Sequence, residues 1–152
     1  MERRHEVLFT QLETYRGELL ACVADVSGER AETVPPGFRN NVRWHLGHVF
    51  LDQYLWLQAL TRERQPVPEG FQDWFGFGTD PSSFTPATPG VAELKELLAG
   101  QVPDIRARYG ERLEEGFPPT EMGMTTVEQV LVRTVFHEGI HLANVVDILR
   151  FV

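Results

Sequence analysis

One stretch near the end of the chain decides the fold: residues 125–150 read TTVEQVLVRTVFHEGIHLANVVDILR. A threonine followed three residues later by a glutamate, as in Thr125 and Glu128, forms a capping box that marks a helix N-terminus. Behind it, apolar side chains return at helical spacing, so that Val130 and Ile148 share one face. The sequence therefore predicts a helix from Thr125 to about Arg150.

Two earlier segments show the same helical spacing of apolar residues. The first runs from about Glu2 to Val26, and Gly28 is expected to terminate it just beyond its end. The second should begin at Asn40 or Asn41, because either side chain can cap a helix, and should end near Leu60. This second helix is apolar nearly all the way round, which predicts that the bundle or a partner subunit covers it on several sides.

A third helix is signalled by Thr88 as cap and Pro89 as first residue, and its apolar stripe continues to Tyr109. Pro103 lies inside this stripe. Because proline lacks the backbone N–H donor and clashes with the preceding turn, we expect it to kink or split the helix.

The connection between the second and third helices, residues 61–87, is long for a compact domain. It contains five aromatic residues that cannot all stay in water, and we expect it to pack as an ordered lid or arm over an end of the bundle. These aromatic residues are Phe71, Trp74, Phe75, Phe77 and Phe84. A shorter loop spans residues 110–124. The sequence thus predicts an all-α fold: one domain, residues 1–152, built as a four-helix bundle with a long crossover loop between helices 2 and 3.

Composition narrows the classes of function. The formal net charge of −8 and the isoelectric point near 5.1 disfavour binding to a nucleic-acid backbone. Cys22 is the only cysteine, so an intrachain disulfide and a cysteine-rich zinc site are excluded; we expect its side chain to be a small buried hydrophobe. The first residues carry no apolar core of a secretory signal, and no stretch is long enough to span a membrane, so a cytoplasmic protein is expected.

Histidines carry the chemical signal. His137 and His141 are four residues apart, so both imidazoles leave one face of the last helix and can meet a single ion. His48 is the polar group near the centre of the inner face of the second helix, and we expect it to join them. His45, about 60° away around the same helix, is expected to pack behind the ligands or support them. A lone histidine is more often an ordinary core or surface residue, so the prediction depends on the convergence of all three.

The last helix also satisfies the HExxH pattern of zinc proteases, at residues 137–141. In that interpretation Glu138 would be the general base. The remaining architecture lacks the strands and the downstream ligand of such enzymes. Glu138 also points about 100° away from His137, so a solvated carboxylate is the simpler expectation.

The chain resembles the DinB-like superfamily, in particular its YfiT-type metal-dependent members. The matching segments are Trp44-His45-Leu46-Gly47-His48, residues 137–141, and the aromatic-glycine loop at 74–79 followed by Pro89 and Glu93-Leu94. The resemblance implies a four-helix bundle, often a homodimer, with a site for zinc, nickel or a related ion. Carried over, its ligands are His48, His137 and His141. Some relatives are thiol-dependent transferases or isomerases, and others are described as hydrolases.

Together these features predict a metal-dependent enzyme that activates water or a low-molecular-weight thiol. We expect zinc, with nickel, iron or manganese as alternatives, a small-molecule substrate, a homodimer, and neither nucleic acid nor membrane as partner. Asp52, one turn after His48, could orient that imidazole or act as a base. Arg133 could hold an anionic group or simply form a salt bridge. The alternative is a non-catalytic, dimeric, stress-related interaction protein in which the ion joins two helices.

Overall fold

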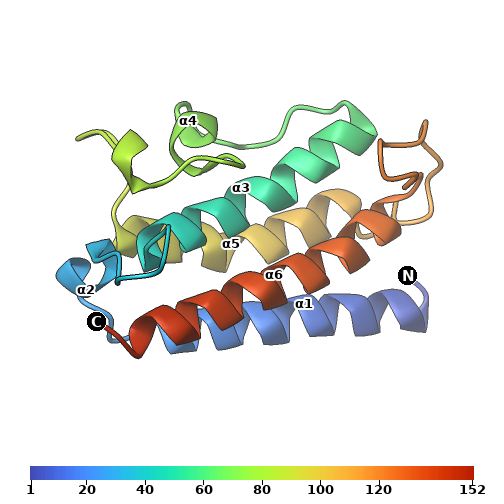
Figure 1. Cartoon of the computed structure of the whole chain (residues 1–152). Coiled ribbons are helices and arrows are strands. Elements are labelled where there is room, and N and C mark those ends of the chain that lie inside the picture. Colours follow the sequence, from blue (N-terminus) through green and yellow to red (C-terminus); the bar gives the residue numbers. More distant parts are fainter.

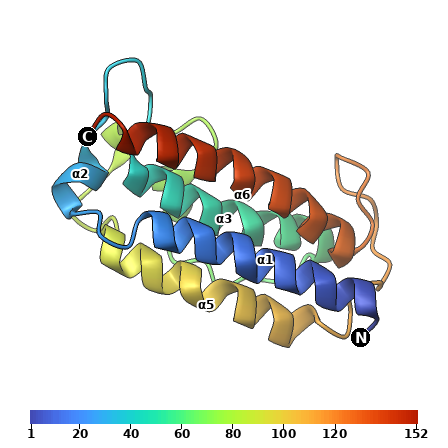
Figure 2. The same ribbon diagram turned by 90° about the horizontal axis from the view of Figure 1, so that it is seen from below.

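The computed structural model describes all 152 residues and contains helices but no strand. The long helices are α1 (Arg3–Cys22), α3 (Val42–Thr61), α5 (Val91–Tyr109) and α6 (Val127–Leu149). α1 packs on α5 and α6, and α3 packs on the same two helices, so the four form a bundle (Figures 1 and 2). The predicted all-α fold is confirmed, and this arrangement agrees with a four-helix bundle. None of the helices combines the length with the hydropathy that a membrane-spanning helix needs.

The long connection between α3 and α5 follows from helix direction, because these two helices run the same way along the bundle (Figure 1). It contains the short helices α4 (Phe71–Phe75) and η1 (Pro81–Ser83), and α4 packs on α3. The connection is ordered as expected, but it lies along the outer side of α3 instead of over an end of the bundle. Phe71 and Phe75 are buried, whereas Phe77 is 99% exposed.

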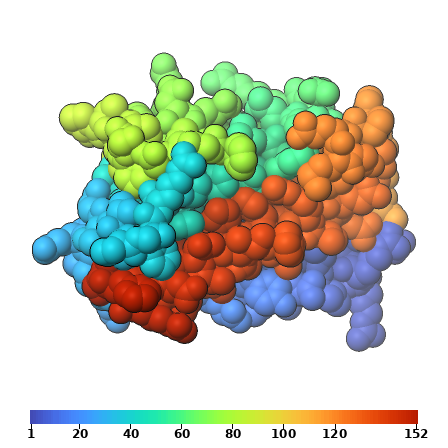
Figure 3. Space-filling model, viewed as in Figure 1, coloured from blue at the N-terminus to red at the C-terminus, as the bar shows by residue number.

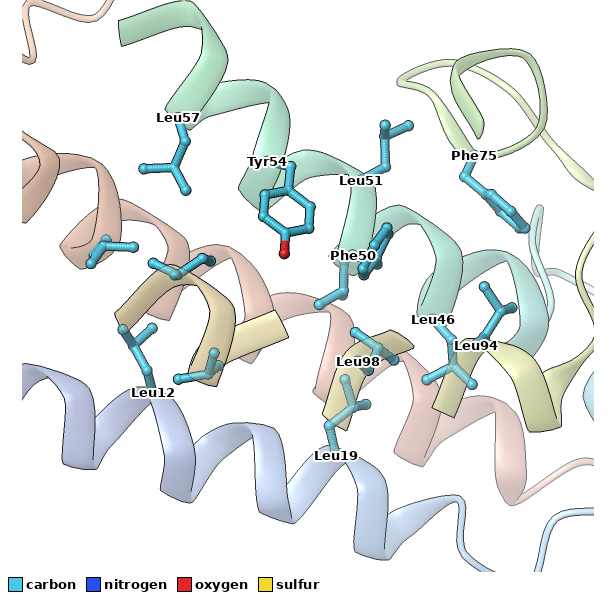
Figure 4. Close-up of a cluster of buried hydrophobic side chains, with 14 of the residues drawn as sticks. Leu12, Leu19, Leu46, Phe50, Leu51, Tyr54, Leu57, Phe75, Leu94 and Leu98 are labelled. Carbon is cyan, nitrogen blue, oxygen red and sulfur yellow. The ribbon is translucent and has the colours of Figure 1, made fainter. Parts of the chain in front are cut away.

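A single cluster of buried apolar side chains joins the four long helices. It includes Leu19 of α1, Leu46 of α3, and Leu94 and Leu98 of α5, and Figure 4 shows Leu19 beside Leu98. All four side chains are completely buried, which removes their apolar surface from water and fixes how the helices are rotated about their axes.

The first helix is shorter than predicted. α1 ends at Cys22, and Gly28 is the first residue of a further short helix, α2 (Gly28–Glu32), where we had expected a terminator. The cause is Ser27, whose side chain accepts a hydrogen bond from the backbone N–H of Arg30 and so caps α2. Cys22 is only partly buried, although it does pack against the core.

The third long helix begins at Val91 with Gly90 as its N-cap, two residues later than predicted. It continues unbroken through Pro103, so the expected split does not occur. Pro103 and Ala99 both lie on the exposed face. Water can therefore hydrogen-bond to the carbonyl that the missing proline N–H leaves free.

The cap of α6 is one residue later than predicted. Thr126, not Thr125, is the N-cap, and its hydroxyl accepts from the backbone N–H of Gln129. The Gln129 side chain in turn accepts from the backbone N–H of Thr125. Gln129, at the third helical position, is therefore the capping-box residue that we expected Glu128 to be. The Glu128 carboxylate pairs with Arg4 instead.

Candidate metal centre

The three predicted histidines converge between α3 and α6, the two helices that carry them. Nε2 of His137 lies 3.2 Å from Nε2 of His48 and 3.1 Å from Nε2 of His141. The ligand atoms of all three fall within 4.8 Å of one another. His48 is buried and the other two are partly buried, so the cluster lies just below the surface.

These separations fit the geometry of a shared ion. Imidazole nitrogens bound at 2.0–2.1 Å to one metal, with angles between 90° and 110°, lie about 2.8–3.4 Å apart. The two Nε2 separations in the cluster fall inside this range. The donor set of three imidazole nitrogens suits zinc and its first-row neighbours, and it does not identify the metal.

Two of the three rings are held from behind through Nδ1. Nδ1 of His48 donates to the carbonyl oxygen of Phe75 at 2.7 Å. Nδ1 of His137 lies 3.1 Å from Oδ2 of Asp52. A proton kept on Nδ1 by an acceptor leaves the lone pair on Nε2, which is the arrangement that a metal ligand needs.

His141 is held by another histidine, since its Nδ1 lies 2.8 Å from Nδ1 of His45. Burial, and to a smaller extent the neighbouring His48, lower the pKa of His45 to about 4. Both rings of the pair are therefore neutral near pH 7. When Nδ1 of His141 donates to Nδ1 of His45, the lone pair of His141 is on Nε2, as a metal ligand requires. His45 supports the cluster from behind, as expected.

Burial also keeps the three converging rings uncharged. It lowers the pKa of His137 to about 4 and that of His141 to about 2, and it lowers the pKa of His48. Neutral imidazoles whose Nδ1 atoms are already engaged present three lone pairs to one another. Lone pairs repel, whereas a cation among them is attracted to all three, so the residues present fit a divalent metal ion.

Asp52 does not contact the ring that we had assigned to it. We expected it to orient His48, but its carboxylate lies at His137, because the Phe75 carbonyl already occupies Nδ1 of His48. Arg133 forms an ion pair with the same carboxylate. The Arg133 guanidinium also lies over the ring of Trp56, 4.8 Å from its centroid.

The segment 44–48 positions His48 by two contacts that sequence reasoning did not identify. The Trp44 ring stacks on the His48 ring with centroids 4.6 Å apart, and its Nε1 donates to Thr79 of the long connection. Gly47 lets Phe75 approach: a Cβ at this position would lie only 2.3 Å from the Phe75 ring. A glycine inside a helix was the available signal for such a close approach, whereas nothing in the sequence marks a backbone carbonyl as a partner.

Glu138 is neither solvated nor directed at the histidines, which corrects both expectations. Its side chain is 3% exposed, and its carboxylate accepts from Arg16 of α1 at 2.6 and 3.1 Å. Arg16 also donates to the carbonyl of Leu98 and to the side chain of Gln53. Because the Glu138 carboxylate is paired with Arg16 inside the bundle, it is not placed to act as the general base that the zinc-protease interpretation requires.

A family model described as the DinB superfamily matches residues 11–145. The chain belongs to the DinB superfamily. The matched part includes the whole of α3 and both histidines of α6, so the converging cluster lies within the region that this DinB protein shares with its family. A comparison with curated proteins found none whose sequence matches the chain.

A cavity of about 630 Å³ adjoins the cluster and reaches Asp52 and Arg133. One wall is the second half of α3, including Leu55 and Trp56; the others are Phe77 and the loop at 119–121. Figure 3 shows this loop, in orange, against the green end of α3. No histidine lines the cavity, and its link to the cluster is Asp52, whose carboxylate contacts Nδ1 of His137.

Proposed function

We propose that this DinB protein is a metal-dependent enzyme in which His48, His137 and His141 bind one divalent transition-metal ion. Zinc is the first choice, with nickel, iron or manganese as alternatives. The observation that supports the proposal is that Nε2 of His137 lies 3.1–3.2 Å from Nε2 of both other histidines, while each Nδ1 is engaged by another group.

A site with three protein ligands favours catalysis over a purely structural role, because a fourth position stays open. When bound there, the ion would supply Lewis acidity that lowers the pKa of a water or a thiol. The chain's own contribution is orientation. Asp52 keeps the His137 ring in place, and Phe75 does the same for His48. The proposed reaction is hydrolysis or transfer of a low-molecular-weight thiol.

The adjoining cavity is the proposed site for the body of the substrate. Leu55 and Trp56 offer apolar contact, and Arg133 brings a guanidinium to the same wall. Because its partner Asp52 also contacts His137, an anionic group bound by Arg133 would lie next to the metal ligands. Asp52 is proposed to act as a base only after Arg133 has turned toward such a group.

The second candidate function is non-catalytic, with the ion joining α3 to α6 in a stress-related interaction protein. The observation in its favour is that no histidine lines the cavity. In that case chelation would mainly lower the free energy of unfolding. An ion whose free concentration is a hundred times its Kd stabilises the folded state by about 2.7 kcal/mol, and chelation removes this contribution.

The test combines elemental analysis with turnover. We expect the purified variant H48A/H137A/H141A to contain one equivalent of transition metal less than wild type. Gln58→Ala, on the exposed face of α3, should contain as much metal as wild type. Thiol–electrophile pairs and esters then serve as substrates. Metal-dependent turnover that is lost in His48→Ala supports the enzyme. Full metal loading without turnover on either panel, together with a large drop in Tm on chelation, would favour the second candidate.

A further inference from the structure

A second cluster of metal-binding groups lies where α1 begins, at the same end of the bundle as the loop that precedes α6 (Figure 1). His5 of α1, Glu114 of the loop and Glu128 of α6 each offer a ligand atom, and these atoms lie within 4.8 Å of one another. The proposed function uses none of them.

The carboxylates of this end have an evident partner in Arg4. Its guanidinium pairs with Glu2 at 2.9 Å, with Glu128 at 3.0 Å and with Glu114. Glu128 also lies in the first turn of α6, where a negative charge is favoured by the helix dipole. Within the cluster, the two carboxylates of Glu114 and Glu128 against one guanidinium leave one negative charge uncompensated, and Glu2 draws on the same guanidinium.

His5 is the group that these interactions do not explain. Its residue is 4% exposed, and Nε2 is buried without any hydrogen-bond partner. The Glu128 carboxylate lies 3.7 Å from this nitrogen, which is too far for a hydrogen bond. A buried polar atom without a partner destabilises a fold, so a partner belongs at this position, between His5 and the carboxylates.

We propose that His5, Glu114 and Glu128 form a second site for a divalent transition-metal ion, separate from the three-histidine centre. One imidazole nitrogen and two carboxylate oxygens are a donor set that Zn²⁺ accepts. Arg4 is the cation that competes for the same carboxylates; its side chain is half exposed, so it can turn into solvent when the ion binds. The bound ion joins the beginning of α1 to the beginning of α6.

The experiment counts Zn²⁺ ions per chain by equilibrium dialysis and elemental analysis. We expect His5→Gln and the double variant E114Q/E128Q each to bind one ion fewer than wild type. Glu115→Gln is the matched control, because Glu115 is in the same loop but pairs with Arg112, and it should bind as many ions as wild type. Arg4→Gln removes the competing cation and should tighten this site about tenfold.

His5→Gln changes a buried position and so risks failing to fold. The double variant E114Q/E128Q then still tests the site, because Glu114 is exposed and Glu128 is only partly buried. The measured quantity is the difference in bound Zn²⁺ ions per chain between wild type and each variant. This difference does not depend on whether the three-histidine centre holds an ion. Equal numbers of Zn²⁺ ions in wild type and E114Q/E128Q would overturn the proposal. So would an Nε2 resonance of His5 that stays unchanged in ¹⁵N NMR while Zn²⁺ binds to the H48A/H137A/H141A protein.

Discussion

The contact between Gly47 and Phe75 links packing to the metal centre, because the Phe75 carbonyl holds His48. In Gly47→Ala the added methyl would clash with the Phe75 ring and displace it. We expect the free energy of unfolding to fall by about 1–3 kcal/mol and Zn²⁺ binding to weaken. Gly139→Ala is the control, since no atom lies within 4 Å of its Cβ. The free energy of unfolding of Gly139→Ala should rise by up to about 1 kcal/mol, and its Zn²⁺ affinity should equal that of wild type.

Asp52 supplies a charge behind His137, and Asp52→Asn removes that charge while keeping a similar shape. Loss of such a supporting partner typically weakens metal binding by about 10–100-fold. We expect a Zn²⁺ Kd raised by at least about tenfold in competition with a chelator. Asp147→Asn, on the exposed side of α6, provides the baseline. A Kd equal to that of Asp147→Asn would mean that the Asp52 contact does not orient the ligand.

At the scale of the element, α1 and α6 are joined by the buried ion pair of Arg16 and Glu138. Glu138→Ala leaves a guanidinium buried without a partner, which should lower the free energy of unfolding by about 3–5 kcal/mol in urea. The double variant R16M/E138M removes both charges and should recover most of that loss. If Glu138→Gln instead folded normally and lost only turnover, Glu138 would be a catalytic base after all.

At the scale of the whole molecule, the homodimer stays a prediction, and of the two alternatives for covering the apolar α3, the bundle and a partner subunit, the chain uses the bundle. α3 is covered within the chain by α4, α5 and α6. The exposed apolar stripe is on α6, at Val132, Phe136 and Ile140, which are 57%, 73% and 43% exposed. Residues four apart share a helix face, so the three form one continuous stripe. Such a stripe suits a self-complementary contact between two copies.

Phe136→Asp places a charge in the middle of this stripe and should convert a dimer to a monomer in light scattering coupled to size-exclusion chromatography. Val7→Asp, at a 50% exposed position of α1, is the matched control and should leave the dimer intact. A wild-type protein that is monomeric at all concentrations, or a dimer that Phe136→Asp leaves unchanged, would contradict the prediction.

The sequence by itself determined the all-helical fold, the approximate extent of the long helices, and that His48, His137 and His141 face inward, whereas the burial of His5 was not predicted. Each of these predictions depends on spacing within one helix, and that spacing is fixed by 3.6 residues per turn. His137 and His141 therefore share a face whatever surrounds them. The cap of α6 at Thr126 is a shift of one residue between two competing threonines. The short helix α2, which begins at Gly28, was not predicted.

Only the tertiary structure decided which groups meet across helices. Asp52 serves His137 and not His48, and Glu138 turns inward to Arg16. These pairings depend on how each helix is rotated and how far it is shifted along its neighbours, which the packing of the whole core sets. A backbone carbonyl such as that of Phe75 carries no signature in its side chain, so its part in the site becomes visible only after the chain has folded.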